Sequence, residues 1–563
     1  MGGATATECS RYSCENAGET LAWIKAIIHF ITPFSQLINA HVVNFFQDRL
    51  WENVDKEWMD CLRGESVQNL LLIPSGVIQD HWPTSLKEFI LKLRSMVFRQ
   101  EQADIDMALP GQQMTSLNSV LAQGMNIKKK HEVEVLSAVV STIADSVRAH
   151  AIVDVGAGQG YLAQVLSFQY QHSVIAIDAC SHHGRVTGAR AERIKKHYTS
   201  QMLKSGLGMR SLNVPKTITC RVLSIDTLKT LIETSLPGDD IEESRLKVES
   251  QEDHEKLNWH SDAEKKPSIV LAGLHACGDL SVTMLKTFLE CKDVKAVVSI
   301  GCCYNLLSEA SITDAGSECG FPMSQAARST GLSLGKSARD LACQSAERWK
   351  SLDNDAGIHN FQLHDFRAAF QMVLYKYFPE VLMSTPSIGR KGKALRRRQQ
   401  RRSAESQLHF KGSTCHMQRN SPPGLPVESE NDGIMTFVSE VQALPSEIPS
   451  RVRAGDDGTK SNKEFLLFEN FCQSGLSHLG LKHSLDINLQ GIWKEAEPFA
   501  DLIGPYWSLR AALGPLLETL ILLDRLLFLQ EQDSALEVYL LPIFDPNISP
   551  RNVAIIAKKV DKD

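Results

Sequence analysis

Residues 152–160 read Ile-Val-Asp-Val-Gly-Ala-Gly-Gln-Gly, and this stretch decides the fold of the chain. An apolar run typical of a buried strand leads directly into Gly156, Gly158 and Gly160, which are spaced two residues apart. Glycine permits a tight turn and a close approach of the backbone to a ligand, and a following helix points free N–H groups at that ligand. The stretch therefore predicts a strand, a nucleotide-binding turn and a helix.

Acidic residues at the ends of predicted strands indicate which nucleotide binds there. Asp154 precedes a Gly-x-Gly-x-Gly turn, a spacing that favours S-adenosylmethionine over the dinucleotide pattern Gly-x-Gly-x-x-Gly. A second apolar run, 174–177, ends in Asp178, about twenty residues beyond the turn, where a doubly wound fold places the carboxylate that binds ribose hydroxyls. A third run, 218–225, ends in Asp226, which we expect near the adenine amino group. Cofactor contacts are therefore predicted for Asp154, Gly156, Gly158, Gly160, Asp178 and Asp226.

Two further predicted strands, 268–273 and 296–301, lead into histidine and cysteine residues. Because both loops leave the carboxyl edge of a parallel sheet, their side chains are predicted to converge where a substrate binds. His275 follows the first of these strands and is a candidate general base for methyl transfer to a hydroxyl or amine. The alternative is a strand-end histidine bonded to the backbone.

The cysteines after these strands are Cys277, Cys302 and Cys303. They occupy the two loops from which 5-methylcytosine enzymes draw a nucleophile and its partner, so we count them with His275 as catalytic candidates. A packing role is the alternative for thiols of this kind. The four residues also offer zinc ligands, but the adjacent Cys302-Cys303 pair departs from Cys-x-x-Cys spacing, so the prediction is that no metal binds.

Several segments together resemble a known family. They are residues 125–132, the glycine turn, 274–280, 302–305 and 544–552, and their combination is similar to the methyltransferase-like protein twenty-five family. The resemblance covers roughly 20–380 and 463–560. It implies an S-adenosylmethionine-dependent methyltransferase, EC 2.1.1.-, whose acceptors are poorly established. The segments 274–280 and 302–303 are also similar to eukaryotic tRNA ribose 2'-O-methyltransferases of the acceptor stem, in which a histidine follows, whereas Tyr304 and Asn305 follow here.

The expected architecture is α/β, with a Rossmann-like class I methyltransferase sheet, an N-terminal helical domain and a disordered insertion. The apolar runs 536–541 and 553–557, joined by a turn-rich segment, predict a closing β-hairpin after the insertion. The predicted boundaries are a flexible N-terminus at 1–19, a helical domain at 20–124, the first part of the core at 125–383 with a flexible excursion at 238–266, a disordered basic insertion at 384–462, and completion of the core at 463–563.

Composition narrows the class of protein. The 563 residues carry a net charge of -6, so any contact with nucleic acid must use a local basic patch. Thirteen cysteines without a signal peptide favour a reducing compartment, and we expect a cytoplasmic or nuclear location. The most apolar stretch, 511–529, contains Glu518, Asp524 and Arg525, which predicts a buried helix and no membrane contact.

RNA is the favoured acceptor. Lys128 and Lys129, placed ahead of a helix expected to start near Val133, are predicted to contact RNA phosphates, and Tyr304 and Asn305 are predicted to bind substrate. The Pro-Pro-Tyr segment of amino-nitrogen methyltransferases acting on adenine does not follow the fourth strand. A protein acceptor and a catalytically inactive, cofactor-binding scaffold protein remain the alternatives, and the sequence predicts no oligomeric state.

Overall fold

A computed structural model describes residues 12–110, 115–205, 212–222, 224–235, 268–309, 319–384, 457–481, 486–532 and 535–560. Contacts within the chain divide it into two compact units. We call residues 1–40, 64–353 and 507–563 the sheet unit, and residues 41–63 and 354–506 the helical unit. The predicted excursion at 238–266 and nearly all of the predicted insertion, 385–456, lie outside the described residues.

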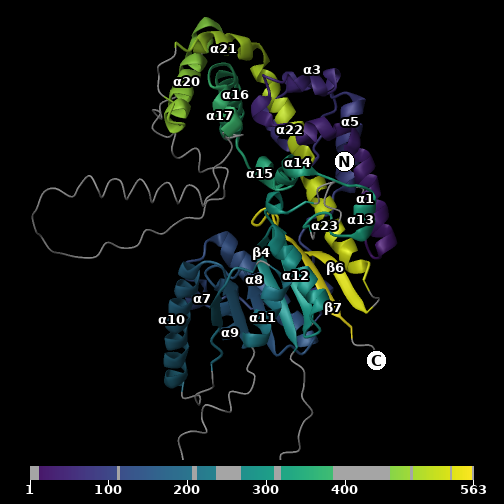
Figure 1. Cartoon of the computed structure of the whole chain (residues 1–563), viewed down its shortest axis with the longest axis vertical. Coiled ribbons are helices and arrows are strands. Elements are labelled where there is room, and N and C mark those ends of the chain that lie inside the picture. The colour runs from purple at the N-terminus through teal and green to yellow at the C-terminus, as the bar shows by residue number, and fades with distance from the viewer. Residues whose placement is uncertain are drawn as a thin grey trace, which may run out of the picture. The chain divides into compact units, whose positions relative to one another are not determined.

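A seven-stranded sheet forms the centre of the sheet unit, as the sequence predicts (Figure 1). The strand order is β3-β2-β1-β4-β5-β7-β6, in which the pairs from β3 to β5 are parallel and β7 runs antiparallel to both β5 and β6. The predicted closing hairpin is therefore confirmed. The strands are β1 Ala151–Val155, β2 Val174–Asp178, β3 Lys216–Thr219, β4 Ile269–Cys277, β5 Val294–Cys302, β6 Leu536–Pro542 and β7 Val553–Lys559.

Apolar residues fill both faces of the central strands. Every residue of β1 is buried, as expected for a strand covered by helices on both sides. Alternate residues point to opposite faces, and Ile152, Val270 and Val298 lie in one hydrophobic cluster together with residues of α8 and α9. Helix α12 packs on β4 and β5. The parallel strands thus deliver their carboxyl ends, and the loops that follow them, to one edge.

Helices of the sheet unit come from both ends of the chain. The N-terminal helices 17–40 and 64–109 group with the sheet, and α1 packs against α23 near the C-terminus. The helices are α1 Ala17–Ile31, α2 Ser35–Asn39, α4 Val67–Leu72, α5 Thr84–Met96, α6 Ile105–Ala108, α7 Ser119–Ala122, α8 Ile127–Ser146, α9 Tyr161–Phe168, α10 Ser181–Ser205, α11 Ile225–Ser235, α12 Asp279–Glu290, α13 Gln325–Ser329, α14 Gly335–Leu341, α15 Ala346–Lys350 and α23 Gly514–Gln530.

By length and composition alone, the segment Ala17–Asn39 is the one helix among the described residues that is long and apolar enough to cross a membrane. Its apolar side includes the buried residues Trp23, Ile24 and Ile27. The Trp23 indole N–H donates a hydrogen bond to Met96 O over 2.9 Å. These contacts account for the apolar side of the segment as part of the core of the sheet unit.

An aromatic cluster holds the helical unit together. Phe366, Phe468 and Trp493 contact one another with ring centroids 5.0–6.0 Å apart, which joins α16, α20 and α21. The helices of this unit are α3 Lys56–Arg63, α16 Asn354–Tyr377, α17 Pro379–Ser384, α20 Asp457–His478 and α21 Leu489–Ala496, and α22 Ile503–Ala512 begins in it.

Two local predictions were wrong. The predicted third strand, 218–225, is a short strand ending at Thr219, and α11 begins at Ile225 because the Ser224 hydroxyl accepts a hydrogen bond from Thr227 N, as a helix N-cap does. The apolar pattern of 506–529 also predicts a single helix, but the structure has two, α22 and α23, which break at Leu513 ahead of a proline in the first turn of α23.

Candidate active site

The glycine turn after β1 adopts the conformation that its residues predict. Gly156, Gly158 and Gly160 have φ values of 79°, 57° and 70°, a region that other residues rarely adopt. A Cβ at Gly160 would collide with Thr187, whereas a Cβ at Gly158 would meet nothing within 4 Å. The backbone at Gly158 therefore faces open space, which suits the close approach of a ligand.

Asp178, at the end of β2, is hydrogen-bonded to this turn. Its Oδ2 accepts a hydrogen bond from Gly158 N over 2.9 Å, and its Oδ1 accepts one from Cys180 N over 2.8 Å. His183 Nδ1 lies 3.0 Å from the same Oδ1. A carboxylate offers about four acceptor positions, so Oδ2 keeps one for a ligand hydroxyl. Asp178 thus both holds the glycine turn and has capacity for one further bond.

Asp154 is a buried carboxylate with an unsatisfied oxygen. Its side chain is 1% exposed, and Oδ2 has no hydrogen-bond partner among the described residues. Burial raises the pKa of Asp154 to about 7, against a smaller lowering by the backbone N–H of Ala163. A buried acceptor without a donor is costly, and a ligand that brings a donor to this point would satisfy it. The open turn, Asp154 and Asp178 therefore fit a nucleoside cofactor with hydroxyl and amino donors.

Asp226 is not where the third-strand prediction puts it. It is exposed and lies in the first turn of α11, where a carboxylate stabilises the N-terminal end of the helix. Its predicted contact with adenine therefore has no support from a strand end.

Glu132 is the centre of a buried polar network beside the turn. Its side chain is fully buried on α8 and accepts hydrogen bonds from the Ser549 hydroxyl over 2.7 Å and from Lys129 Nζ over 3.1 Å. His275 Nε2 lies 3.0 Å from Glu132 Oε1 and 3.1 Å from Oε2. Burial raises the pKa of Glu132, but the hydrogen bond and charge of His275, with the charge of Lys129, outweigh it and lower the pKa to about 2. Glu132 therefore stays ionised and fixes the His275 ring.

The backbone at His275 is strained in a way that directs its side chain. His275 has φ 61°, and the β4–β5 register shifts between Gly273 and Ala276. Such an irregularity changes the direction of a side chain within a strand, and non-glycine residues with positive φ concentrate at functional sites. His275 is partly exposed, at 27%, and bonds to a carboxylate, so the alternative of a histidine bonded to backbone does not describe it.

The structure brings Cys277, Cys302 and Cys303 together. The Sγ–Sγ distances are 3.1 Å for Cys277–Cys302, 3.5 Å for Cys277–Cys303 and 3.7 Å for Cys302–Cys303. Cys277 and Cys302 are register partners on β4 and β5, and Cys303 has φ 50°, so the chain turns back directly after β5. We call these three residues the thiol cluster. Cys277 is exposed and Cys302 is buried, so the cluster opens to solvent on one side.

Hydrogen bonds inside the thiol cluster give the three thiols different pKa values. The pKa of Cys303 is lowered to about 3, because Cys277 and Cys302 donate hydrogen bonds to its sulfur. The pKa of Cys302 is raised by its contacts with Cys277 and Cys303 and by burial. Within the cluster these hydrogen bonds favour the thiolate form of Cys303.

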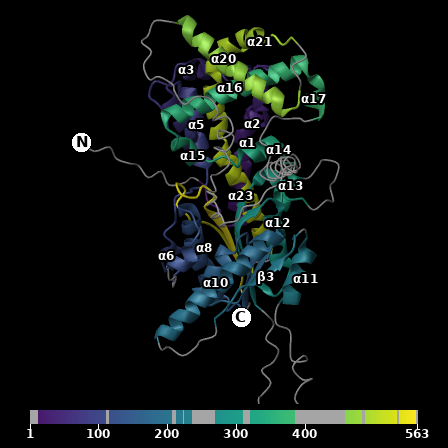
Figure 2. The same ribbon diagram turned by 90° about the vertical axis from the view of Figure 1, so that its left-hand side faces the viewer.

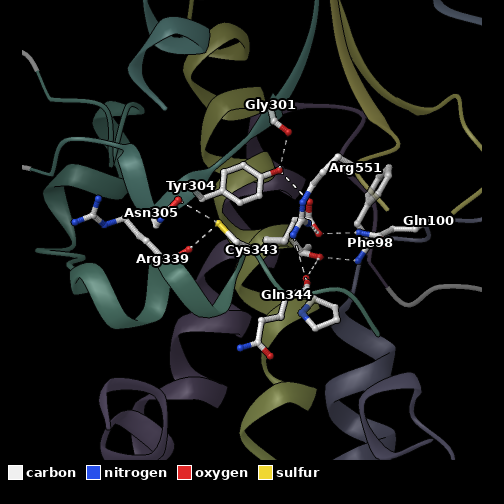
Figure 3. Close-up of polar contacts among 12 residues, drawn as sticks. Phe98, Gln100, Gly301, Tyr304, Asn305, Arg339, Cys343, Gln344 and Arg551 are labelled. Carbon is white, nitrogen blue, oxygen red and sulfur yellow. Dashed lines mark hydrogen bonds and ion pairs between the residues drawn. The ribbon is translucent and has the colours of Figure 1, made fainter. Parts of the chain in front are cut away.

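Tyr304 was predicted to bind substrate, and this prediction is wrong. Its side chain is 1% exposed, and its hydroxyl donates a hydrogen bond to Glu518 Oε1 over 2.9 Å. Figure 3 shows the Tyr304 hydroxyl directed toward Gly301 and Arg551. Asn305 is half-buried and accepts a contact from Cys343 Sγ at 3.7 Å. Tyr304 is thus a support beneath the thiol cluster, and burial raises its pKa well above the usual range.

Two arginines flank the Tyr304 ring. Arg551 Cζ and Arg525 Cζ lie 5.5 Å and 5.6 Å from the ring centroid. Arg551 forms an ion pair with Glu518 over 2.5 Å, and Gln100 donates a hydrogen bond to the same carboxylate. None of the three nitrogens of the Arg525 guanidinium has a hydrogen-bond partner among the described residues, although the side chain is 1% exposed.

Lys128 and Lys129 do not precede a helix, as predicted, but lie within the first turn of α8. The helix starts at Ile127 because the Asn126 side chain accepts a hydrogen bond from Lys129 N and caps it. The Lys129 side chain is 20% exposed and its ammonium is paired with Glu132, so the prediction of a free phosphate contact is wrong for Lys129. Lys128 is half-buried.

Comparisons with known proteins agree with this geometry. Residues 128–310 match the model of a methyltransferase domain. The chain is 24% identical to "Probable methyltransferase-like protein 25" of Mus musculus over an alignment of 651 positions that covers 96% of each chain. It is 21% identical to the protein of the same name from Homo sapiens, over 96% of this chain and 97% of that one. The chain is thus similar over nearly its full length to methyltransferase-like protein 25. It contains a methyltransferase domain that runs from α8 past the thiol cluster, and no solved structure matches it.

Sequence reasoning missed the parts of this methyltransferase site that support the others. Glu132 falls on the same face of α8 as Val135, Leu136 and Val139, so an acid within an apolar stripe was the signal for a buried partner. Glu518 and Arg525 carry the same signal in an apolar helix, since charges there need a partner or an anionic neighbour. Their partners come from distant segments, which the sequence does not identify.

Proposed function

We propose that the chain transfers the methyl group of S-adenosylmethionine to an RNA acceptor. The observation that carries the proposal is the open glycine turn, flanked by the unsatisfied Asp154 carboxylate and by Asp178 with one acceptor position left. A sulfonium donor supplies a strongly electrophilic methyl group when it is bound. The protein then has to hold donor and acceptor in line and remove one proton.

His275 is the residue that we assign to proton removal. Its Nε2 faces the ionised Glu132 carboxylate, which favours the tautomer with the proton on Nε2. Nδ1 has no hydrogen-bond partner among the described residues and is left to accept a proton from the acceptor. Leu280 lies at the start of α12, and a Cβ at Gly156 would meet its Cδ2 at 3.1 Å, so the helix that follows β4 begins beside the glycine turn.

The support for RNA is helix α10, which starts three residues after Asp178. Its exposed residues include Arg185, Arg193, Lys195, Lys196 and Lys204. The helix has one acid, Glu192, and its 25 residues extend over about 37 Å. Figure 2 shows α10 along its length beside β3. A basic helix of this length, adjoining the cofactor turn, is complementary to a run of backbone phosphates.

Titration calorimetry with S-adenosylmethionine tests the donor assignment. Gly158→Arg meets no neighbouring atom, strains the backbone by about 1–2 kcal/mol through its positive φ, and places a side chain where the ligand would lie. We expect at least a 30-fold loss of affinity, about 2 kcal/mol. Gly331→Arg is the matched control, since Gly331 also has positive φ, 68°, and no atom within 4 Å of a Cβ. Equal binding by both variants and the unsubstituted chain would contradict the cofactor assignment.

Transfer of labelled methyl groups to fractionated RNA and protein tests the acceptor. We expect label in RNA, and the triple variant Arg193→Glu, Lys195→Glu, Lys196→Glu should reduce RNA binding and flatten its salt dependence by about 0.7 to 0.9 per lost phosphate contact. Lys494→Glu, an exposed lysine of α21, is the control. Label in protein alone would overturn the RNA assignment, and cofactor binding without any label would favour the inactive scaffold.

A further inference from the structure

The thiol cluster has no assigned part in the proton transfer described above, and its geometry calls for a separate explanation. Consecutive residues of a strand point to opposite faces, so Cys302 and Cys303 would ordinarily project apart. The left-handed backbone at Cys303, φ 50°, folds the chain so that all three sulfurs lie within 3.7 Å of one another. A non-glycine residue adopts this conformation at a cost of about 1–2 kcal/mol, and here it serves to add a third thiol to a pair.

The spacing of the three sulfurs matches a tetrahedral zinc site more closely than a disulfide. A Zn–S bond of about 2.3 Å in a tetrahedron separates sulfurs by about 3.8 Å, and the three distances here are 3.1, 3.5 and 3.7 Å. Two of them need little adjustment, and the Cys277–Cys302 pair has to open by less than 1 Å. A disulfide needs two sulfurs about 2.05 Å apart, and it would not explain the position of the third thiol.

The charge around the thiol cluster also favours a zinc site. Three thiolates and Zn²⁺ carry a net charge of -1, which a protein interior tolerates when a cation lies nearby. Arg525 is buried, has no hydrogen-bond acceptor among the described residues, and has Cys302 among its electrostatic partners. A Cβ at position 301, directly before Cys302, would collide with Arg525 Nη1, so the guanidinium reaches the backbone of the cluster.

We propose that Cys277, Cys302 and Cys303 bind one Zn²⁺ ion as three thiolate ligands, with Arg525 balancing the charge. His275 is not the fourth ligand, because its Nε2 is held by Glu132 and it lies outside the group of mutually close ligand atoms. The fourth position opens on the exposed Cys277 side and takes a water or an acceptor group. Three protein ligands with an open position are the arrangement of catalytic zinc sites.

Metal analysis of the full-length protein tests this directly, without an activity measurement. The chain, loaded with Zn²⁺ under reducing conditions and then desalted, should retain one zinc per chain. Cys277→Ser should lower the retained zinc below half, and its folding is least at risk because Cys277 is exposed. Cys319→Ser, at a buried cysteine outside the cluster, is the matched control and should keep the metal. Replacement by Co²⁺ should give intense thiolate-to-metal absorption that weakens in each cluster variant.

Arg525→Met supplies a second, independent measurement, since it removes the guanidinium charge and leaves an unbranched apolar side chain at this buried position. We expect at least a tenfold loss of zinc affinity in competition with a chromophoric chelator. Retention of no zinc by the unsubstituted chain, or equal retention by Cys277→Ser and Cys319→Ser, would overturn the proposal. A Cys277–Cys302 disulfide found by mass spectrometry after reduction and zinc loading would overturn it as well. An unsubstituted chain that retains zinc but does not bind S-adenosylmethionine would refute the donor assignment and leave the zinc site standing.

Discussion

Replacing Glu132 by glutamine should lower the free energy of unfolding of the sheet unit by more than the loss of an exposed ion pair does. The carboxylate is fully buried and accepts from Ser549, Lys129 and His275, which come from three segments of the unit. Glutamine keeps the shape but loses the charge, and its amide N–H₂ has to face one of these donors. Breaking a buried charged pair by changing one partner typically costs about 3–5 kcal/mol.

The pKa of Glu132 gives a second estimate of how much the carboxylate contributes to the free energy of unfolding. It also predicts how this contribution depends on pH. The folded-state pKa of about 2 lies below the ordinary value of 4.5, so the ionised form stabilises the fold at pH values above 4.5. At about 1.4 kcal/mol for each tenfold difference in proton affinity, this contribution is about 3 kcal/mol. It is lost as the pH falls from 4.5 toward 2. The difference between the unsubstituted chain and Glu132→Gln should therefore be nearly constant from pH 7 to 5 and less than half as large at pH 3.

Denaturant unfolding, followed by a probe in the sheet unit, measures this difference at each pH. Glu537→Gln is the matched control, because Glu537 forms an ion pair with Lys558 over 2.8 Å but is 50% exposed, and exposed pairs contribute at most about 1 kcal/mol. If Glu132→Gln costs no more than the control, or costs the same at pH 3 as at pH 7, the network does not act through a buried charge.

Three further substitutions test other parts of the site. Gly160→Ala should lower the free energy of unfolding by about 2–4 kcal/mol and abolish cofactor binding in calorimetry, because its Cβ collides with Thr187 at a positive φ; normal binding would contradict the turn geometry. Tyr304→Phe should cost about 1.5–3 kcal/mol in denaturant unfolding, since Glu518 loses a buried hydrogen bond, and a cost below 0.5 kcal/mol, on the order of a surface substitution, would refute this support role. Asn126→Ala should cost about 1 kcal/mol by the same measurement through loss of the helix cap, and an unchanged midpoint would show that the cap contributes nothing.

The parts of the fold that the sequence predicted are those with local signals. The run 152–160 has the apolar pattern of a strand and glycines that only a turn requires, and the structure contains both. The hairpin strands are likewise apolar runs, separated by turn-forming residues. The third strand failed because Ile218 to Ile225 mixes strand-forming residues with Ser224, whose capping hydrogen bond starts a helix. The local sequence does not show where the strand ends and the helix cap begins, because the extent of the strand depends on its pairing with β2.

The candidate site was predictable where its residues follow strands and unpredictable where they meet across the chain. The convergence of Cys277 with Cys302 follows from the register of two adjacent parallel strands. The burial of Tyr304 does not, since it depends on Glu518, which lies 214 residues later. The role of Glu132 likewise depends on Ser549, 417 residues away. Pairs of this separation leave no periodic signal in the sequence.

The position of β7 in the sheet determines when, during synthesis, the sheet can be completed. Strand β5 ends at Cys302, and β7, which pairs with it, begins at Val553. At a synthesis rate of about 5–20 residues per second, the roughly 250 intervening residues take about 12–50 s to appear. During that time β5 is an open, apolar edge, which is a template for pairing with other chains. A ribosome-bound chain therefore needs protection until β7 emerges, and a chain released before Val553 would expose this edge permanently.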